Sequence, residues 1–448
     1  MKKILFGSLL VAGILWAQGS QPAKISQEDI KIQNELSDAS LKDITPKSLE
    51  EFFEEFEEAH NITYGQTKNG KTFYTGEANV SVSDTDPQFA QSLQLAFEKA
   101  MLNLQKEFIK DAFGRISTEK IATYEHDQSS NAREFEELPK GGTISQVFDK
   151  LTQLAGAKLD AALRDLGVDA TGLSEERKKI LLKDEFMSKS ITQAFGSMSG
   201  LIPIQTIVTH KRGEYKIGVI AVISDKTRQL ARDMSLGRQS LIKGKGGKAI
   251  KDYLPKENAG FVNEYGIRLV YDENGAPVIL SYGNWGFVAD AGNAKKTNRL
   301  EDAAKETALT KADSAIIEFI NTNISLKDEQ TTGETYKQEI KETLNKTDNT
   351  KDLSETDITN TVDKVSRRIK ATASGKIRGI RTIKQWSYTA ENGVEHVGVV
   401  RAYSYANLEN TNQMLKTPTQ QPSNNATTKS SETKVQRQSN IVNDLDDF

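Results

Sequence analysis

The chain has 448 residues but no cysteine and only four histidines. Without cysteine, the chain can form neither disulfide bonds nor thiolate metal sites, and no lipid can be attached through a thiol. The histidines are too far apart in sequence for the i, i+4 pair of a helical zinc site: His60, His126, His210 and His396. We therefore predict no metal site and no cofactor, and interpret each histidine as a structural or solvated side chain.

Neither sign of charge is in marked excess, with 59 basic and 62 acidic side chains and a formal net charge of −3. Proteins that bind nucleic acid usually carry a basic face, so this balance predicts no nucleic-acid partner. Aromatic residues make up only 7% of the chain, and we therefore expect small, mainly aliphatic cores. The length is sufficient for two of them.

The most apolar segment stands at the N-terminus and is too short to cross a bilayer, which needs about 20 apolar residues. Lys2 and Lys3 precede the apolar residues 4–16, and Ala17 follows them. This pattern is typical of a secretory signal peptide. We predict a periplasmic or secreted protein after cleavage, with no transmembrane segment in the mature chain. An uncleaved N-terminal anchor is the alternative.

The second half of the chain repeats the pattern of the first. Residues 217–224 are similar in sequence to residues 397–404, and residues 204–207 are similar to residues 380–383. These matched segments occur in the same order in both halves. They predict an internal duplication, with two tandem copies of one domain.

Each half also has an Asn-Gly turn that leads into an apolar strand and an alanine-rich helix. Asn and Gly accept positive φ at low cost, so the turns at Asn69 and Asn274 predict β-hairpins. In the first copy we expect the hairpin to pair residues 62–64 with residues 72–74. The helix positions that match between the copies are Ala96, Ala100, Leu104 and Phe108, then Ala304, Ala308, Ala312 and Ile316.

These patterns predict the α+β class, with each copy an antiparallel sheet packed on its alanine-rich helix. The first copy carries a helical insert, and the second carries a more polar one. The predicted order is a signal peptide (1–17), a flexible leader (18–45), a first domain (46–234) with its insert at about 143–195, a Gly/Lys-rich connector (235–260), a second domain (261–415) with its insert at about 325–355, and a disordered tail (416–448).

Three segments of the first domain carry more specific expectations. An acidic helix begins near residue 47, and we expect its apolar face to pack on the domain, with partner binding as the alternative: Leu49, Phe52, Phe53 and Phe56. Residues 114–142 are polar and are predicted to be irregular. Residues 144–166 are predicted to form one helix that ends at Gly167.

The connector contains glycines and lysines at 243–248 that suggest a phosphate-binding loop. The GxxxxGK[ST] spacing is missing, however, and Ala249 stands where a magnesium-binding hydroxyl is required. We predict a flexible basic loop, with contact to an anionic surface as the alternative.

The C-terminal tail is rich in Pro, Gln, Ser, Thr and Asn, a composition that predicts disorder. It ends in apolar residues among acids, which are candidates for a partner-docking motif: Asp444, Leu445, Asp446, Asp447 and Phe448. Such a tip predicts a groove on the partner that is both basic and apolar. The alternative is an acidic end that only increases solubility.

One combination of motifs occurs in both copies. It joins a strand with glycine and alanine, an alanine-spaced helix, and a hairpin strand with Val/Ile-Gly-Val. The residues are 74–78, Ala96, Ala100 and 215–219, then Gly286, Ala304, Ala308 and 397–399. The combination resembles the N-terminal domain of the flagellar H-ring/T-ring accessory protein family and the related small surface lipoproteins. This resemblance implies an α+β domain for protein–protein contact in the cell envelope, without catalytic residues. The chain departs from that family by lacking the lipidated cysteine and by its insert and tail.

We therefore predict a non-enzymatic interaction or assembly module of the envelope, with an envelope protein as partner. The alternative is an envelope hydrolase whose site lies between the copies and uses carboxylates such as Glu77 and Asp290. A third hypothesis is a homo-oligomeric ring or filament in which domains pack head to tail. Converging carboxylates between the copies would favour the enzyme, and an exposed apolar strip would favour assembly.

Overall fold

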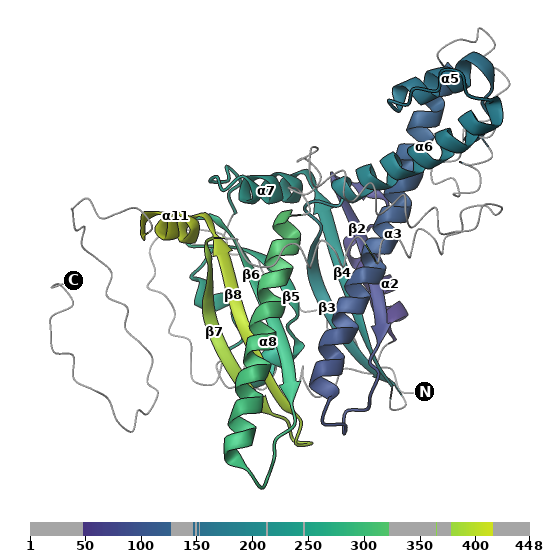
Figure 1. Ribbon diagram of the computed structural model, residues 1–448. Helices are drawn as coiled ribbons and strands as arrows, with labels where there is room; N and C mark the ends of the chain where they lie inside the picture. The colour runs from purple at the N-terminus through teal and green to yellow at the C-terminus, as the bar shows by residue number, and fades with distance from the viewer. Residues whose placement is uncertain are drawn as a thin grey trace, which may run out of the picture.

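The computed structural model describes residues 48–126, 154–211, 214–244, 247–321 and 378–414, with isolated helical positions at 147, 150, 151, 153 and 364. Figure 1 shows two similar units, each a sheet with a long helix on one face. Both sheets are antiparallel and four-stranded, in the orders β1-β2-β4-β3 and β5-β6-β8-β7. The predicted α+β class with two tandem copies is confirmed.

The strands and helices of the two copies follow the same order. The strands are β1 (Thr67–Lys68), β2 (Lys71–Asn79), β3 (Ile202–Lys211) and β4 (Glu214–Ser224), then β5 (Gly266–Tyr271), β6 (Pro277–Phe287), β7 (Ile380–Thr389) and β8 (Glu395–Ser404). The helices are α2 (Leu49–His60), α3 (Phe89–His126), α5 (Gly156–Asp165), α6 (Glu175–Ser197), α7 (Asp225–Ser235), α8 (Ala294–Asn321) and α11 (Tyr405–Met414), with 3-10 turns η1 (Ile250–Tyr253) and η2 (Asn258–Asn263). Within these ranges, no helix is both long and apolar enough to span a membrane.

A glycine in the second strand of each copy lets the long helix lie directly on the sheet. A Cβ on Gly76 would stand 2.2 Å from the carbonyl oxygen of Ala100, and one on Gly283 would stand 1.9 Å from that of Ala308. This geometry confirms the predicted match between the two helices. The sequence pattern had placed Gly286 in this motif, but the counterpart of Gly76 is Gly283.

The repeated Val/Ile-Gly-Val motif serves the opposite face of each sheet. A Cβ on Gly218 would stand 2.9 Å from the ring of Phe53 on α2, and one on Gly398 would stand 2.3 Å from the ring of Trp386. Each glycine therefore makes room for an aromatic side chain. Helix α2 packs here with its apolar face, as predicted, and begins with a capping box between Ser48 and Glu51.

The edge strands β3 and β7 correspond in a different register from the one expected. Ile207 pairs with Gly218 and Trp386 pairs with Gly398, so Ile207 corresponds to Trp386. The predicted match of Ile207 with Ile383 is therefore wrong by three residues. Both strands contain a bulge at the equivalent position. The pairing of β3 with β4 therefore matches the pairing of β7 with β8 on both sides of the bulge.

Two helical predictions in the first copy are corrected. Residues 114–126 are not irregular but continue α3, because buried Phe113, Ser117 and Ile121 extend its inner face. The single helix expected over 144–166 is interrupted, since Ala155 is extended and α5 begins at Gly156, which has φ +56°.

The first hairpin is shorter than predicted. Its turn is confirmed, with φ of 52° at Asn69 and 71° at Gly70. Residues 62–64 are not a strand, however, and β1 contains only two residues. The apolar side chain of Tyr64 instead packs beside Phe53 under α2, with the rings 6.2 Å apart.

The connector is not a flexible loop where the structure describes it. The backbone N–H of Gly244 donates to the carbonyl oxygen of Gly275 at 3.0 Å, and that of Lys248 donates to Tyr271 at 3.2 Å. A Cβ on Gly244 would stand 2.1 Å from the Tyr271 ring. Glycine therefore allows backbone contact with the β5–β6 hairpin, and η1 and η2 pack beside the outer face of the second sheet.

His396 on β8 lies in this outer core, and its burial lowers its pKa from 6.5 to about 4. Below pH 6.5 the unfolded chain takes up a proton that the folded chain binds only near pH 4. Stability is therefore lost as the pH falls through this window, by about 2 kcal/mol between pH 7 and pH 5. Denaturant unfolding measures the free energy of unfolding at pH 7 and at pH 5. We expect the decrease between these two pH values to be about 2 kcal/mol smaller in the His396→Gln variant than in the unsubstituted protein. The same change at exposed His60 is the control, and identical pH dependence in all three proteins would contradict the assignment.

The signal segment, the leader, the polar insert at 325–355 and the tail with its tip, Asp444 to Phe448, lie outside the described residues. Their predicted roles therefore stay predictions.

Candidate functional site

The two copies meet along one edge of each sheet. Strands β3 and β5 lie next to each other but belong to separate sheets, and α3 and α8 lie side by side on the same face (Figure 1). Helix α3 also reaches across to β6, where Gln91 donates to the carbonyl oxygen of Gly286 at 2.8 Å. We call this contact zone the junction.

A buried apolar cluster joins the copies on one side of the junction. Ile202 of β3 and Met234 of α7 pack in the same cluster as Ile267 of β5 and Phe319 of α8. The hydroxyl of Tyr403 on β8 donates to the carbonyl oxygen of Met234 at 3.2 Å. The two copies therefore share a core here.

Arg268 on β5 forms the polar part of the junction. Its guanidinium donates to the carbonyl oxygens of Tyr265 and Ile267, both at 2.9 Å, and to the hydroxyl of Thr206 on β3 at 3.3 Å. It also lies 3.5 Å from the carboxylate of Glu264. Burial lowers the pKa of Arg268 and raises that of Glu264, which Arg268 partly offsets. Arg268 of β5 therefore contacts the edge strand β3 through its side chain, although β3 and β5 do not pair with each other.

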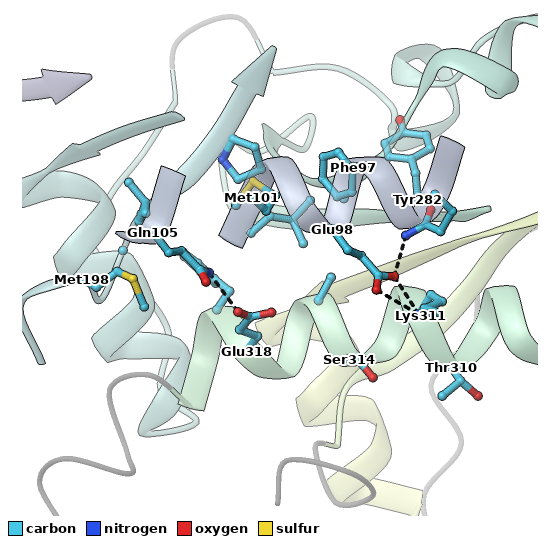
Figure 2. A pocket seen from close by; sticks show the side chains of 18 residues that line it. Phe97, Glu98, Met101, Gln105, Met198, Tyr282, Thr310, Lys311, Ser314 and Glu318 are labelled. Atoms are coloured by element: carbon cyan, nitrogen blue, oxygen red, sulfur yellow. Dashed lines mark hydrogen bonds and ion pairs between the residues drawn. The ribbon is translucent and has the colours of Figure 1, made fainter. Parts of the chain in front are cut away.

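A cavity of about 270 Å³ is lined by residues of α3 and α8 and of the edge strands β3 and β5 (Figure 2). The apolar part of its wall comes from both copies and contains Phe97, Met101, Met198, Ile267 and Phe319. Gly200 and Gly266 also line it. The cavity therefore lies where strands β3 and β5, which belong to separate sheets, do not pair.

Polar pairs cross the cavity from one helix to the other, as the dashed lines in Figure 2 show. Lys311 of α8 lies 2.7 Å from the carboxylate of Glu98 on α3, which also accepts a hydrogen bond from Gln94 at 3.0 Å. Further along, Gln105 of α3 donates to the carboxylate of Glu318 on α8 at 2.9 Å. Each cavity carboxylate is therefore engaged by a side chain of α3 or α8.

Two residues that line this cavity each carry a polar atom that is inaccessible to solvent and has no hydrogen-bond partner among the described residues. The two atoms are the side-chain oxygens Oε1 of Gln94 and Gln105, whose residues are only 4% and 6% exposed. The amide nitrogens already donate to carboxylates, so the unpaired atoms are acceptors. Neither glutamine was predicted from the sequence to be a functional residue. The available signal was that Gln94, Glu98 and Gln105 share a helix face with Phe97 and Met101.

The structure does not bring together the two carboxylates that were predicted for a hydrolase. Glu77 projects on the α2 side of the first sheet, where its carboxylate lies 3.9 Å from Lys216. Asp290 precedes α8, and hydrogen bonds from Lys296 and Gly292 lower its pKa. Neither residue lines the cavity. Within the part of the chain that the structure describes, no three histidine or acidic side chains are grouped closely enough to hold a metal ion.

A second feature is a helical arm, which we define as residues 109–126 of α3 together with residues 156–187, which contain helix α5 and the first half of α6. It extends away from both sheets in Figure 1. Its core includes Phe113, Ile121, Leu159, Leu163 and Phe186. Thus the arm has apolar packing of its own, continuous with the core of the first copy.

Comparisons with known proteins gave one family match and one structural match. Residues 144–236, which include α5, α6, β3, β4 and α7, match a family model described as a domain of unknown function, DUF6844. A similar solved structure is the 2.3 Å crystal structure of a hypothetical protein from Francisella tularensis, at 23% sequence identity and a TM-score of 0.48. That match covers 87% of this chain and 94% of the other. A comparison with curated proteins gave no match.

Proposed function

We propose that this chain is an exported, envelope-associated protein that binds another protein without catalysing a reaction, and that the helical arm is its main binding surface. The resemblance of its motifs to the H-ring/T-ring family supports a role in envelope protein contacts. The signal-like N-terminal segment supports export.

The observation that carries this proposal is the length of the arm. Helix α3 has 38 residues and is about 57 Å long, whereas the nine residues of β2 span about 30 Å. About half of the helix therefore lies beyond the strand on which it packs. An extension of this size contributes little to the sheet cores, but it presents a broad surface to a partner.

The arm also exposes two large apolar side chains near the start of α6. Leu173 precedes the helix and is 37% exposed, and Ile180 lies seven positions later and is 54% exposed. These two side chains are therefore the best candidates for the centre of a protein contact.

The junction supports binding over hydrolysis. Glu98 is held by Lys311 and Gln94, and Glu318 is held by Gln105. A hydrolase would need a carboxylate placed to transfer a proton or to attack a substrate. The hydrolase alternative therefore has no specific contact in its favour among the described residues, and it stays a prediction.

The outer edge strand gives little support to a head-to-tail filament. Strand β3 is the edge at the junction, and β7 is the opposite, outer edge of the second sheet. Arg381 and Lys384 are exposed on β7, and the equivalent positions of β3 hold the uncharged residues Ile202 and Gln205. Charged side chains on an edge strand oppose pairing with another sheet. We therefore place the partner on the arm, with the C-terminal tip (Asp444 to Phe448) as a second contact proposed from the sequence.

Affinity capture from gently solubilised envelopes tests the proposal, with the chain from residue 18 as bait. The double variant Leu173→Asp/Ile180→Asp is expected to lose the captured partner. The matched control Val288→Asp/Leu300→Asp changes residues that are 46% and 37% exposed and lie outside the arm, and it should retain the partner. A chain that ends at Asn440 shows whether the tip adds to binding. Equal capture by the arm variant and the control would overturn the assignment.

A further inference from the structure

We propose that the leader, residues 18–45, adds a strand to the open edge of β2 and that residues 29–33 form this strand. Composition alone predicted a flexible leader, whereas this proposal gives residues 29–33 a fixed place on the first sheet. The contact is separate from the arm and does not depend on the proposed protein partner.

The edge of β2 is open over its second half. Strand β1 pairs with only the first two residues of β2, and beyond them the backbone N–H of Gly65 donates to the carbonyl oxygen of Phe73 at 2.9 Å. Residues 75–79 of β2 pair with β4 on one side and with no other described strand. A row of unpaired backbone groups on a sheet edge is a template for another strand.

The backbone groups that face outward on this edge are those of Thr75, Glu77 and Asn79. Alternate residues of an antiparallel strand turn their N–H and C=O groups to the same side, and the outward bond of Phe73 fixes which residues these are. Among the described residues, the group that bonds to this row is the side-chain amide of Asn103 on α3, 2.8 Å from the carbonyl oxygen of Glu77. The N–H groups of Thr75 and Glu77 can therefore pair with an added strand.

The equivalent edge of the second copy is covered. By the match of the strand glycines, residues 75–79 of β2 correspond to residues 282–286 of β6. Tyr282 pairs with β5, and the carbonyl oxygen of Gly286 accepts the hydrogen bond from Gln91 of α3 in the first copy. No described strand or neighbouring copy covers β2 in this way, and the leader is the segment that comes directly before the described part of the first copy.

The leader joins the fold beside this edge. The Nζ of Lys216 on β4 lies 3.9 Å from the carboxylate of Glu50, in the first turn of α2, and 3.9 Å from that of Glu77. The start of α2, which follows the leader, is therefore close to the open segment. The roughly 15 residues between positions 33 and 48 can span up to about 50 Å, whereas five residues of a strand occupy only about 17 Å.

Residues 29–33 have the pattern of a strand with one apolar face. Ile30 and Ile32 alternate with polar residues, which is the period of two that is typical of a half-buried strand. On an added strand, the isoleucines would continue the buried face of β2 that packs on α3. Lys31 would then lie on the same face as Glu77, and opposite charges on neighbouring strands stabilise pairing.

Hydrogen exchange of single backbone amides, in the chain that begins at residue 18, tests the proposal. We expect the amides of Thr75 and Glu77 to exchange at least about tenfold more slowly in the unsubstituted chain than in the Ile32→Pro variant, because proline removes a donor and disrupts an added strand. The matched control Ile25→Pro makes the same change outside residues 29–33 and should keep the slow exchange. Unchanged protection of β6 and β8 checks that each variant is folded.

The contrary outcomes identify what else could occupy the edge. Equally fast exchange of Thr75 and Glu77 in all three proteins would overturn the proposal, because the edge would then be open. Equally slow exchange in all three would also overturn it, since another segment would then cover the edge. Protection that rises with protein concentration would assign the edge to a second copy of the chain instead of the leader.

Discussion

The Gly283→Ala variant will lose about 3 kcal/mol or more of its free energy of unfolding, although it gains only one methyl group. The added Cβ would stand 1.9 Å from the carbonyl oxygen of Ala308 and 2.8 Å from the backbone nitrogen of Ala312. These are backbone atoms of α8, so no side chain can turn aside. The helix must move off the sheet, which separates Ile316 on α8 from the apolar cluster that it shares with Ile279 of β6. Denaturant unfolding monitored by circular dichroism measures the loss.

The control for this prediction is Gly292→Ala. Gly292 does not have positive φ, and its added Cβ would stand 3.5 Å from the nearest atom, the Oδ1 of Asp290. We expect a change within about 0.5 kcal/mol. Gly76→Ala should resemble Gly283→Ala, since its added Cβ would stand 2.2 Å from the carbonyl oxygen of Ala100 on α3. If Gly283→Ala were as stable as the control, the account of the duplicated helix contact would be wrong.

The Phe186→Ala variant will lose the structure of the arm while the second copy remains folded. Phe186 is fully buried, with its ring centroid 6.4 Å from that of Tyr124 and the Lys120 amine 5.8 Å from its centre. Truncation of a buried phenylalanine costs about 3 to 5 kcal/mol. Most of this loss falls on α5, α6 and the end of α3, because the arm makes few contacts with the sheets. Hydrogen exchange should show faster exchange of amides in α5 and the first half of α6, and slow exchange in β6 and β8.

The matched control is Phe319→Ala at the junction. Phe319 is 6% exposed and belongs to the cluster that joins the copies, so its truncation should speed exchange near α7 and α8 and leave the arm protected. The Phe186→Ala protein should also lose the captured partner, whereas Phe319→Ala should retain it. Uniform loss of protection in both variants would show that the arm does not unfold as a separate unit.

The sequence was sufficient for the fold class and for the match between the two long helices. Those features depend on local patterns: alanine at helical spacing, and Asn-Gly turns that accept positive φ. The position of the strand glycine was harder to assign, because Gly283 and Gly286 are both in β6 and only the contact with Ala308 distinguishes them.

Features that depend on contacts between distant segments could not be predicted. The bulges in β3 and β7 shift each strand by one residue against its partner, and nothing in the local sequence marks them. Gly244 packs against the ring of Tyr271, which lies in another segment of the chain. The local sequence does not show this contact, and the connector was therefore predicted to be flexible. The helical continuation of α3 was hidden because Ser117, although fully buried, is a polar residue.

The candidate cavity was the least predictable feature of all. Its wall combines α3 of the first copy with β5, β6 and α8 of the second, and α3 ends 140 residues before β5 begins. Gln94 and Gln105 look like ordinary solvated helix residues until α8 is placed beside them. Their spacing on the same face as Phe97 was the available sign that the face is buried.

Site-specific photocrosslinking in living cells tests the central claim most directly. A photoreactive amino acid is placed at Leu173 or Ile180 on the arm, and at Val288 or Leu300 outside it as controls of similar exposure. The account predicts a crosslinked adduct with the same envelope protein from both arm positions and none from the controls. Adducts from the control positions alone, or no adduct from either arm position, would contradict the claim that the arm is the partner-binding surface.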